Sequence, residues 1–360
     1  MSIKGVTKTE ANYRAVNLDS SSSLKDFSVD RKKYLRKYIL NEEVKEKETL
    51  AANMGRIVET LLMEPHLFDE KFYMSTCANV PTAGMLLFTE ALYRHTLDAT
   101  KEDGTISRSF EDLSRDAYID SGYKIKYEAV MSKFIGTDAE LYYNEIRIVR
   151  SKNLTVIETK DVSIAEKIVE ELRTNFVTKD IVNLVDSVKY TVLDQLQVEG
   201  YKLMTGDKIV DNHLFKSMLD KVIINHDEKK IIPYDLKCTW SVENFYEEYY
   251  LHRRAYIQAY LYFNACKSLT IDPDSEYYGY TVENLKFLVC DSTNYMNPLI
   301  YTLTDEDMKE ALNGFTHKNK TYPGVLKIVT DLAWALENNI WNISKENYLL
   351  NGVVNIKKKW

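Results

Sequence analysis

Residues 218–239, MLDKVIINHDEKKIIPYDLKCT, decide the fold of this chain, because they have the pattern of a β-hairpin. Two apolar runs rich in β-branched side chains, 218–225 and 231–240, flank a polar break at 226–230. Apolar runs of this length on either side of a short polar segment predict strand, turn and strand. The predicted hairpin carries two acids and a lysine, which are Asp220, Asp235 and Lys237.

The turn decides whether these three side chains share a face of the sheet. Side chains alternate between the two faces of a strand, so Asp235 and Lys237 project together. An even turn, such as a four-residue loop at 226–229, pairs Asp220 opposite Asp235 on that same face. An odd turn without a bulge places Asp220 on the other face.

Two acids and a lysine on one face suit a metal-dependent reaction at a phosphodiester. Carboxylates held together raise one another's pKa unless a cation lies between them, and Mg²⁺ readily takes oxygen ligands. The backbone carbonyl of Leu236 is a further candidate ligand, beside Asp220 and Asp235. Lys237 is placed to orient or help deprotonate a water whose pKa the metal lowers, or to stabilise charge on a phosphate. The alternative is an ordinary hairpin with charges on its solvent face, which a D-x-K tripeptide alone does not exclude.

A helix is predicted to follow the hairpin at 242–266. Arg254, Gln258 and Tyr262 lie four residues apart and form one stripe along it. An arginine, an amide and a phenol beside a metal site suit contacts to a nucleic-acid backbone, although an aromatic-rich helix can also be plain core. Lys216 lies on the same side of its predicted strand as Asp220 and is a further candidate for contacting a phosphate.

These motifs, in this order, resemble the PD-(D/E)XK nuclease superfamily. Within it, the chain is similar to the phage and prophage recombination exonucleases of the RecE-like and lambda-exonuclease-like branch, which share the RecB-type nuclease pattern. The matching segments are D-L-K-C-T at 235–239, Q-A-Y-L-Y at 258–262, the serine-capped segment 20–38, and MGRIVETLLMEPHLFD at 54–69. The motif reads Ile-Pro-Tyr-Asp, so one residue separates the proline from Asp235.

The resemblance implies an α/β fold with a mixed central sheet flanked by helices, and a Mg²⁺-dependent exonuclease for which Mn²⁺ is expected to substitute. It implies digestion of double-stranded DNA from ends with 5′-to-3′ polarity, a ring-like homo-oligomer, and a single-strand annealing protein as partner. Relatives usually carry a helical histidine near the metal where this chain has Glu59. A carboxylate there is compatible with metal binding, directly or through water, whereas a solvated helix residue is the alternative.

The chain of 360 residues is expected to form one elaborated nuclease domain with a large helical insertion. We expect N-terminal helices in 1–75, the insertion in 76–188, the catalytic sheet with its Q-x-x-x-Y helix in 189–304, and C-terminal helices in 305–360. Helical periodicity predicts the helices 82–97, 110–121, 123–134, 138–149, 162–175, 305–314 and 325–338. Further strands are predicted at 190–203, 284–290 and 299–303.

Bulk properties favour a cytoplasmic protein, in the host cytoplasm if the chain is phage-encoded. The four cysteines are scattered, no apolar run approaches the length of a membrane span, and the N-terminal MSIKGVTKTE lacks a signal-peptide core. A net charge of −7 requires DNA to be held by local clusters of basic residues. Nucleotide-binding and serine-hydrolase motifs are absent from the sequence. Two alternatives stay open: a structure-specific endonuclease of the same fold, and a non-catalytic DNA-binding or assembly protein.

Overall fold

The computed structural model describes residues 8–42, 50–206, 208–292 and 297–354. Two compact units make up the chain: Met1–Glu64 together with Ile164–Trp360 form the first, and Pro65–Ser163 form the second. The predicted insertion, 76–188, overlaps the second unit but shares neither of its boundaries. Residues 1–7, which belong to the N-terminal stretch considered for a signal peptide, lie outside the described residues.

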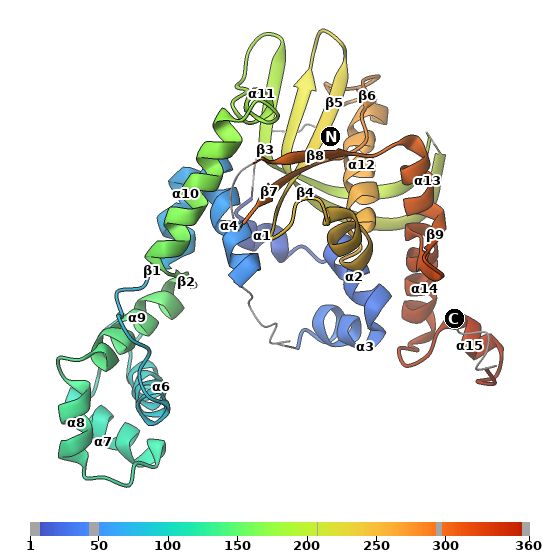
Figure 1. Ribbon diagram of the computed structural model, residues 1–360. Helices are drawn as coiled ribbons and strands as arrows, with labels where there is room; N and C mark the ends of the chain where they lie inside the picture. Colours follow the sequence, from blue (N-terminus) through green and yellow to red (C-terminus); the bar gives the residue numbers. More distant parts are fainter. Residues whose placement is uncertain (1–7, 43–49, 207, 293–296, 355–360) are drawn as a thin grey trace. The chain divides into compact units, whose positions relative to one another are not determined.

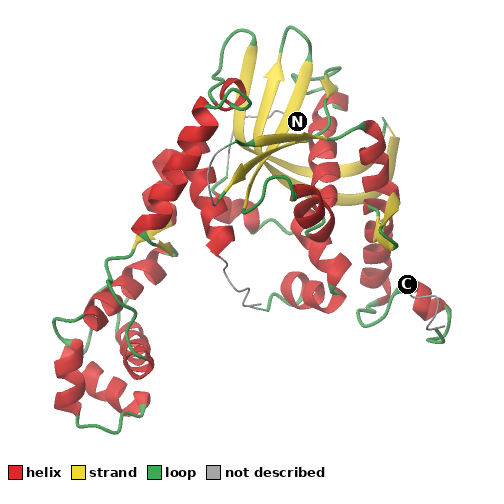
Figure 2. Ribbon diagram, viewed as in Figure 1, coloured by secondary structure: helices red, strands yellow, loops and turns green. Residues whose placement is uncertain are grey.

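A mixed sheet forms the centre of the first unit (Figures 1 and 2). Its strands follow the order β3-β4-β5-β7-β8, and β6 pairs with the beginning of β5. Strand β5 pairs in parallel with β6 and β7, and the other pairs are antiparallel, so the predicted mixed α/β architecture is confirmed. The bounds are β3 Tyr190–Thr205, β4 Lys208–Asn225, β5 Lys230–Thr239, β6 Thr281–Val282, β7 Lys286–Asp291 and β8 Leu299–Thr302.

The hairpin of β4 and β5 has an even turn, which places Asp220 opposite Asp235. Asn225 pairs with Lys230, so four residues form the turn. The antiparallel ladder continues to the pair Lys221 and Tyr234 and stops there. Beyond this point β5 pairs with β7, from Tyr234 to Thr239. The two strands of the hairpin therefore separate at the position where Asp220 and Asp235 face each other.

Helices α2 (Ser21–Val29), α12 (Ala255–Ile271), α13 (Asp305–Asn313) and α14 (Val325–Asn338) enclose the main apolar core together with the sheet (Figure 1). Ser20 caps α2, as the serine-rich segment predicts, by accepting a hydrogen bond from the Ser23 backbone N–H. Asp19, which directly precedes this cap, accepts hydrogen bonds from Tyr34 Oη at 2.9 Å and His213 Nε2 at 2.6 Å. These bonds fix the start of α2 against β4.

The prediction of a single helix at 242–266 is wrong, because one residue in the middle of this segment has a left-handed backbone conformation. A π-helical turn, Tyr246–His252, comes first, and α12 begins only at Ala255. Arg254, between them, has a φ of 54°, a left-handed conformation that ends one helix and cannot continue the next. Arg254 therefore does not share a helical stripe with Gln258 and Tyr262, which both lie on α12.

Helix α4 (Leu50–Met63) packs against β5 and carries Glu59. A Cβ added at Gly55, one helical turn earlier, would lie 4.0 Å from Cys238 Cβ, so the helix backbone lies close to the strand. The remaining elements of the first unit are α1 Glu10–Arg14, α3 Arg31–Tyr34, η1 Leu35–Ile39, α11 Lys179–Val182, η3 Tyr246–His252, β9 Gly314–His317, β10 Lys320–Pro323 and α15 Lys345–Leu349. Helix α10, Thr159–Thr174, crosses the boundary between the units.

The second unit is mainly helical, with its own core around Phe88, Leu92 and Phe134. Its elements are η2 Pro65–Leu67, α5 Phe68–Lys71, β1 Phe72–Met74, α6 Ala83–Asp98, α7 Phe110–Ser121, α8 Tyr127–Phe134, α9 Asp138–Lys152 and β2 Thr155–Ile157. The helices predicted from periodicity in this region are confirmed within a few residues. The parallel pair of β1 and β2 was not predicted, because three-residue strands carry no periodicity.

Among the described residues, no helix combines the length and the apolar character that crossing a membrane requires.

Candidate active site

The separation of β4 from β5 creates a buried place for two carboxylates. Asp220 is 9% exposed and Asp235 is fully buried. The Leu236 backbone N–H lies beyond the end of the ladder, and it donates a hydrogen bond to Asp220 Oδ2 at 2.7 Å. A buried carboxylate requires such donors, since burying an unpaired charge is costly. The side chain of Asp220 thus replaces the strand pairing that the hairpin has lost.

Asp235 is held from two sides. Gln258 Nε2, on α12, donates a hydrogen bond to Asp235 Oδ1 at 2.8 Å. Lys237 Nζ forms an ion pair with Asp235 Oδ2 and donates a hydrogen bond to the Leu236 carbonyl at 3.2 Å. No described residue donates a hydrogen bond of normal geometry to Oδ2, although the atom is buried. The structure therefore brings the three predicted catalytic residues together.

The charges of this group shift the pKa of two of its members. Burial, followed by the charges of Asp235 and Glu59, raises the pKa of Asp220 well above its ordinary value. Burial lowers the pKa of Lys237, but Asp235, Asp220 and Glu59 more than offset this and leave that pKa above its ordinary value. Lys237 is therefore an ammonium group that donates hydrogen bonds, which favours orienting water or stabilising phosphate charge over removing a proton.

Glu59 acts on these residues through its charge and is itself held by β3. Gln195 Nε2 donates a hydrogen bond to Glu59 Oε1 at 2.7 Å. Within the described ranges, no group of three or more acidic, histidine or cysteine side chains is close enough to hold a metal ion. The role of Glu59 as a metal ligand therefore stays a prediction. Contact with the metal through a water molecule is the form of that role that agrees with this arrangement.

The oxygen atoms of this site fit a hard divalent cation. Asp220 Oδ2 and Asp235 Oδ1 each accept a hydrogen bond from the protein, and Asp235 Oδ2 is ion-paired with the Lys237 ammonium. The Leu236 carbonyl lies in the same place and already contacts the Lys237 ammonium. Mg²⁺ commonly binds through one or two carboxylates and keeps several waters, so two carboxylates and a carbonyl suffice.

Lys25, on α2, belongs to the site although sequence reasoning missed it. Its Nζ donates a hydrogen bond to Gln258 Oε1 at 3.0 Å, so Gln258 joins Lys25 to Asp235. Burial, followed by the charge of Lys237, lowers the pKa of Lys25 to about 7. Nothing in the segment SSSLKDF distinguishes this lysine from a solvated one, and only the tertiary fold brings it to α12.

Of the predicted substrate-binding residues, Gln258 and Tyr262 lie at the site. Tyr262 is buried, and burial together with the charges of Asp235 and Asp220 raises its pKa well above the ordinary value. Arg254 lies near Tyr256 instead, where its charge lowers the pKa of that phenol against the larger effect of burial. The Arg254 Nη1 atom is buried without a hydrogen-bond acceptor among the described residues.

The prediction that Lys216 contacts a phosphate needs correction. Its side chain is buried, and Nζ donates hydrogen bonds to the carbonyls of Tyr13, Arg14 and Val16 at 3.0, 3.0 and 2.7 Å. An ammonium group has three N–H donors, so these bonds use all of them. Lys216 therefore holds the end of α1 and its following residues against β4.

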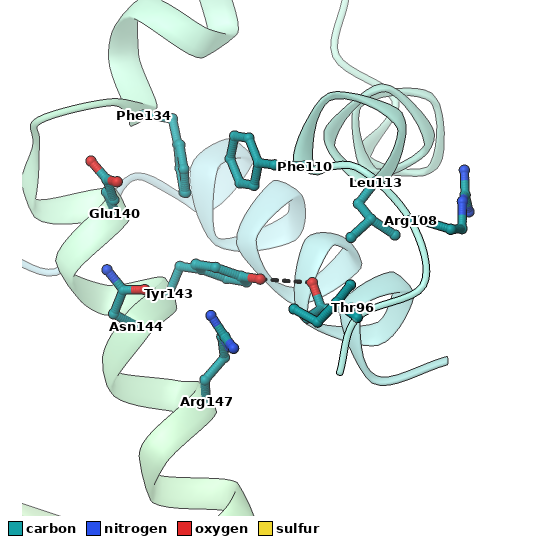
Figure 3. A pocket seen from close by; sticks show the side chains of 10 residues that line it. Thr96, Arg108, Phe110, Leu113, Phe134, Glu140, Tyr143, Asn144 and Arg147 are labelled. Carbon is teal, nitrogen blue, oxygen red and sulfur yellow. Dashed lines mark hydrogen bonds between the residues drawn. The ribbon is translucent and has the colours of Figure 1, made fainter. Parts of the chain in front are cut away.

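A separate pocket of about 240 Å³ lies within the second unit (Figure 3). Phe110 and Phe134 line it, together with Arg147, and a 2.7 Å hydrogen bond joins the hydroxyl groups of Thr96 and Tyr143 at its wall. None of the residues predicted for the active site lines this pocket.

Comparisons with known proteins add little to this geometry. No protein-family model and no curated protein matches the chain. Among solved structures, it is similar to a “Putative exonuclease” from Eubacterium rectale, with a TM-score of 0.44 and 12% sequence identity, over 97% of this chain and 89% of that chain. A similarity at this level carries no argument, so the function must be inferred from the site.

We predict that Lys216→Met destabilises the protein by about 2 kcal/mol, because three carbonyl groups, that of Tyr13 buried, lose the donor they share. Urea unfolding measures the change. Lys230→Met, at a half-exposed ion pair in the hairpin, is the control and should change stability by less than about 0.5 kcal/mol. Equal stability of Lys216→Met and the wild type would restore the idea of an available ammonium group.

The lowered pKa of Lys25 predicts a specific dependence of stability on pH. Between about pH 7 and the ordinary value of 10.5, the unfolded chain binds more protons at this residue than the folded one. The contribution of Lys25 to the free energy of unfolding is therefore lowest below about pH 7 and increases towards pH 10.5. The difference in unfolding free energy between wild type and Lys25→Met, measured with EDTA present, should change in this sense. A difference independent of pH would contradict the burial of a titrating ammonium.

Proposed function

We propose that this protein is a metal-dependent nuclease that hydrolyses the phosphodiester bonds of duplex DNA from ends. The observation that supports this most directly is the convergence of Asp220, Asp235 and Lys237 at the point where β4 and β5 separate. Two buried carboxylates, a backbone carbonyl and an ammonium group supply what phosphodiester hydrolysis requires of a protein. Each component comes from the hairpin, so their spacing is set by a rigid element.

In this proposal, Asp220, Asp235 and the Leu236 carbonyl would hold the divalent cation, and Glu59 would act through water. A bound Mg²⁺ or Mn²⁺ lowers the pKa of a water and offsets phosphate charge. Lys237 donates hydrogen bonds to the attacking water or to a non-bridging phosphate oxygen. Gln258 keeps Asp235 oriented through Oδ1, so that the other oxygen faces the reacting groups.

The cationic and amide groups around the carboxylates support DNA as the substrate. Lys237 contacts Asp235 directly, and Gln258 connects Lys25 to Asp235. Arg253 and His252 are exposed just before α12 and are available to a DNA backbone. The resemblance seen in the sequence implies 5′-to-3′ polarity, a ring-like oligomer, a single-strand annealing partner and a role in recombination. These four properties stay predictions, as does the cytoplasmic location.

The direct test is degradation of duplex DNA in Mg²⁺. Linear DNA labelled at the 5′ or the 3′ end should lose nucleotides, with early release of the 5′ label if the polarity is as implied. Asp235→Asn and Lys237→Met should each lower the rate by at least about a hundredfold, because each removes a charge in contact with the reacting groups. Gel electrophoresis of the time course measures this.

Two exposed residues of the same hairpin serve as matched controls. Asp227→Asn and Lys230→Met change the same charges in and beside the turn, and they should retain wild-type rates. Cutting of closed circular duplex would favour the endonuclease. Metal-independent DNA binding without any cleavage would favour the non-catalytic protein. Cleavage that survives both active-site substitutions would remove the assignment.

Metal binding without DNA gives a second test. Mn²⁺ at about a hundred times its Kd should stabilise the folded protein by about 2.7 kcal/mol. Asp220→Asn should lose most of this gain, because it removes a ligand. In EDTA, the same variant should melt at a higher temperature than the wild type, since a buried carboxyl beside Asp235 is relieved of repulsion. Calorimetry with and without Mn²⁺ measures both effects, and an unchanged Mn²⁺ response in the variant would contradict the ligand assignment.

A further inference from the structure

Gln195, in β3, has an unusual backbone conformation and lies opposite a residue of the candidate active site. Its φ is 52°, and it is the only non-glycine residue with a positive φ inside a strand among the described residues. The pairs Asp194 with Lys221 and Leu196 with Leu219 flank it, so the residue opposite Gln195 on β4 is Asp220. The register is the same on both sides, so no inserted residue of a bulge explains the deviation.

A left-handed glutamine in a strand requires an explanation. The conformation places Cβ too close to the backbone, and glycine would avoid that cost. Gln195 is also 4% exposed, so its amide cannot be satisfied by water alone. Strain of this kind persists only where the surroundings enforce it, and it gathers at functional sites. The contacts of the Gln195 side chain indicate what this left-handed conformation does.

The side chain of Gln195 reaches out of the sheet to α4. Nε2 donates a hydrogen bond to Glu59 Oε1 at 2.7 Å and lies 3.8 Å from Met63 Sδ, one helical turn further along α4. The charge of Glu59, on α4, raises the pKa of both Asp220 and Lys237. The contact therefore joins the residue opposite Asp220 to the third carboxylate of the site.

We propose that Gln195 is a positioning residue, which fixes the Glu59 carboxylate relative to Asp220 by means of its left-handed backbone. This inference rests on the proposed metal-dependent function. Glu59 approaches from α4 and Asp220 from β4. The hydrogen bond from Gln195, opposite Asp220, ties the Glu59 carboxylate to the strand beside Asp220. It orients this carboxylate in the way that hydrogen-bond partners orient metal ligands and their waters.

The test uses substitutions that separate the backbone from the amide. Asparagine tolerates the left-handed conformation but is one methylene too short to reach Glu59. Gln195→Asn should therefore stay folded and weaken Mn²⁺ binding about tenfold, as loss of an outer-shell partner does. Gln195→Ala removes the same amide and should weaken Mn²⁺ binding equally, while melting at a lower temperature than Gln195→Asn. Calorimetric titration with Mn²⁺ and no DNA measures the affinity.

Two further variants distinguish positioning from plain structural support. Lys229→Gly relieves another left-handed residue, with a φ of 50°, in the β4–β5 turn, and should leave Mn²⁺ affinity unchanged. The exchange Glu59→Gln with Gln195→Glu keeps an amide and a carboxylate in contact but moves the charge. It should recover thermal stability relative to Gln195→Ala without recovering Mn²⁺ affinity.

The outcomes separate this inference from the proposed function. If the wild type binds Mn²⁺ and Asp220→Asn abolishes binding, the metal site of the proposed function stands. Wild-type affinity in folded Gln195→Asn then overturns the inference alone. Full recovery of Mn²⁺ affinity in the exchanged pair would also overturn it. If the wild type binds no Mn²⁺, or if Asp220→Asn binds it equally well, the proposed function and this inference fail together.

Discussion

The rest of the site depends on one constraint: two carboxylates of a single hairpin are buried and need hydrogen-bond donors. Bringing an ion out of water costs several kcal/mol, so each carboxylate must be met by donors. Asp220 is met by a backbone N–H that became available because β4 and β5 stop pairing. Asp235 is met by an amide from α12 and an ammonium from its own strand. The splayed hairpin and α12 are thus required by the same two charges.

The part of this arrangement that the sequence predicts is the part set by short-range geometry. Alternation along a strand places Asp235 with Lys237, and a turn of four residues brings Asp220 to them. Helical periodicity likewise predicts α7 and α14 with their observed bounds, because each buries one continuous apolar face. In all these cases the deciding contacts lie within a few residues or across one turn.

The rest depends on contacts between distant segments, which no spacing encodes. Lys25 meets Gln258 across 233 residues, and Gln195 meets Glu59 across 136. Lys216 lies on the same side of its strand as the acids, yet its ammonium donates hydrogen bonds to carbonyl groups about 200 residues away. Alternation along the strand therefore does not predict its contacts. The break at Arg254 was hidden for a related reason. The run of apolar and aromatic residues around it is compatible with one helix, and only packing enforces the left-handed residue.

Two lysines with opposite pKa shifts lie beside the carboxylates of this site. Lys237 lies among carboxylates that hold its pKa above the ordinary value, whereas burial and Lys237 itself bring the pKa of Lys25 to about 7. An anion that approaches both amines favours the charged form of Lys25. Binding a phosphate would then be accompanied by uptake of a proton at Lys25, so the local charge adjusts to the ligand. The net charge of −7 consequently says little about this site, because its two amines are partly buried beside Asp235, Lys237 in direct contact and Lys25 through Gln258.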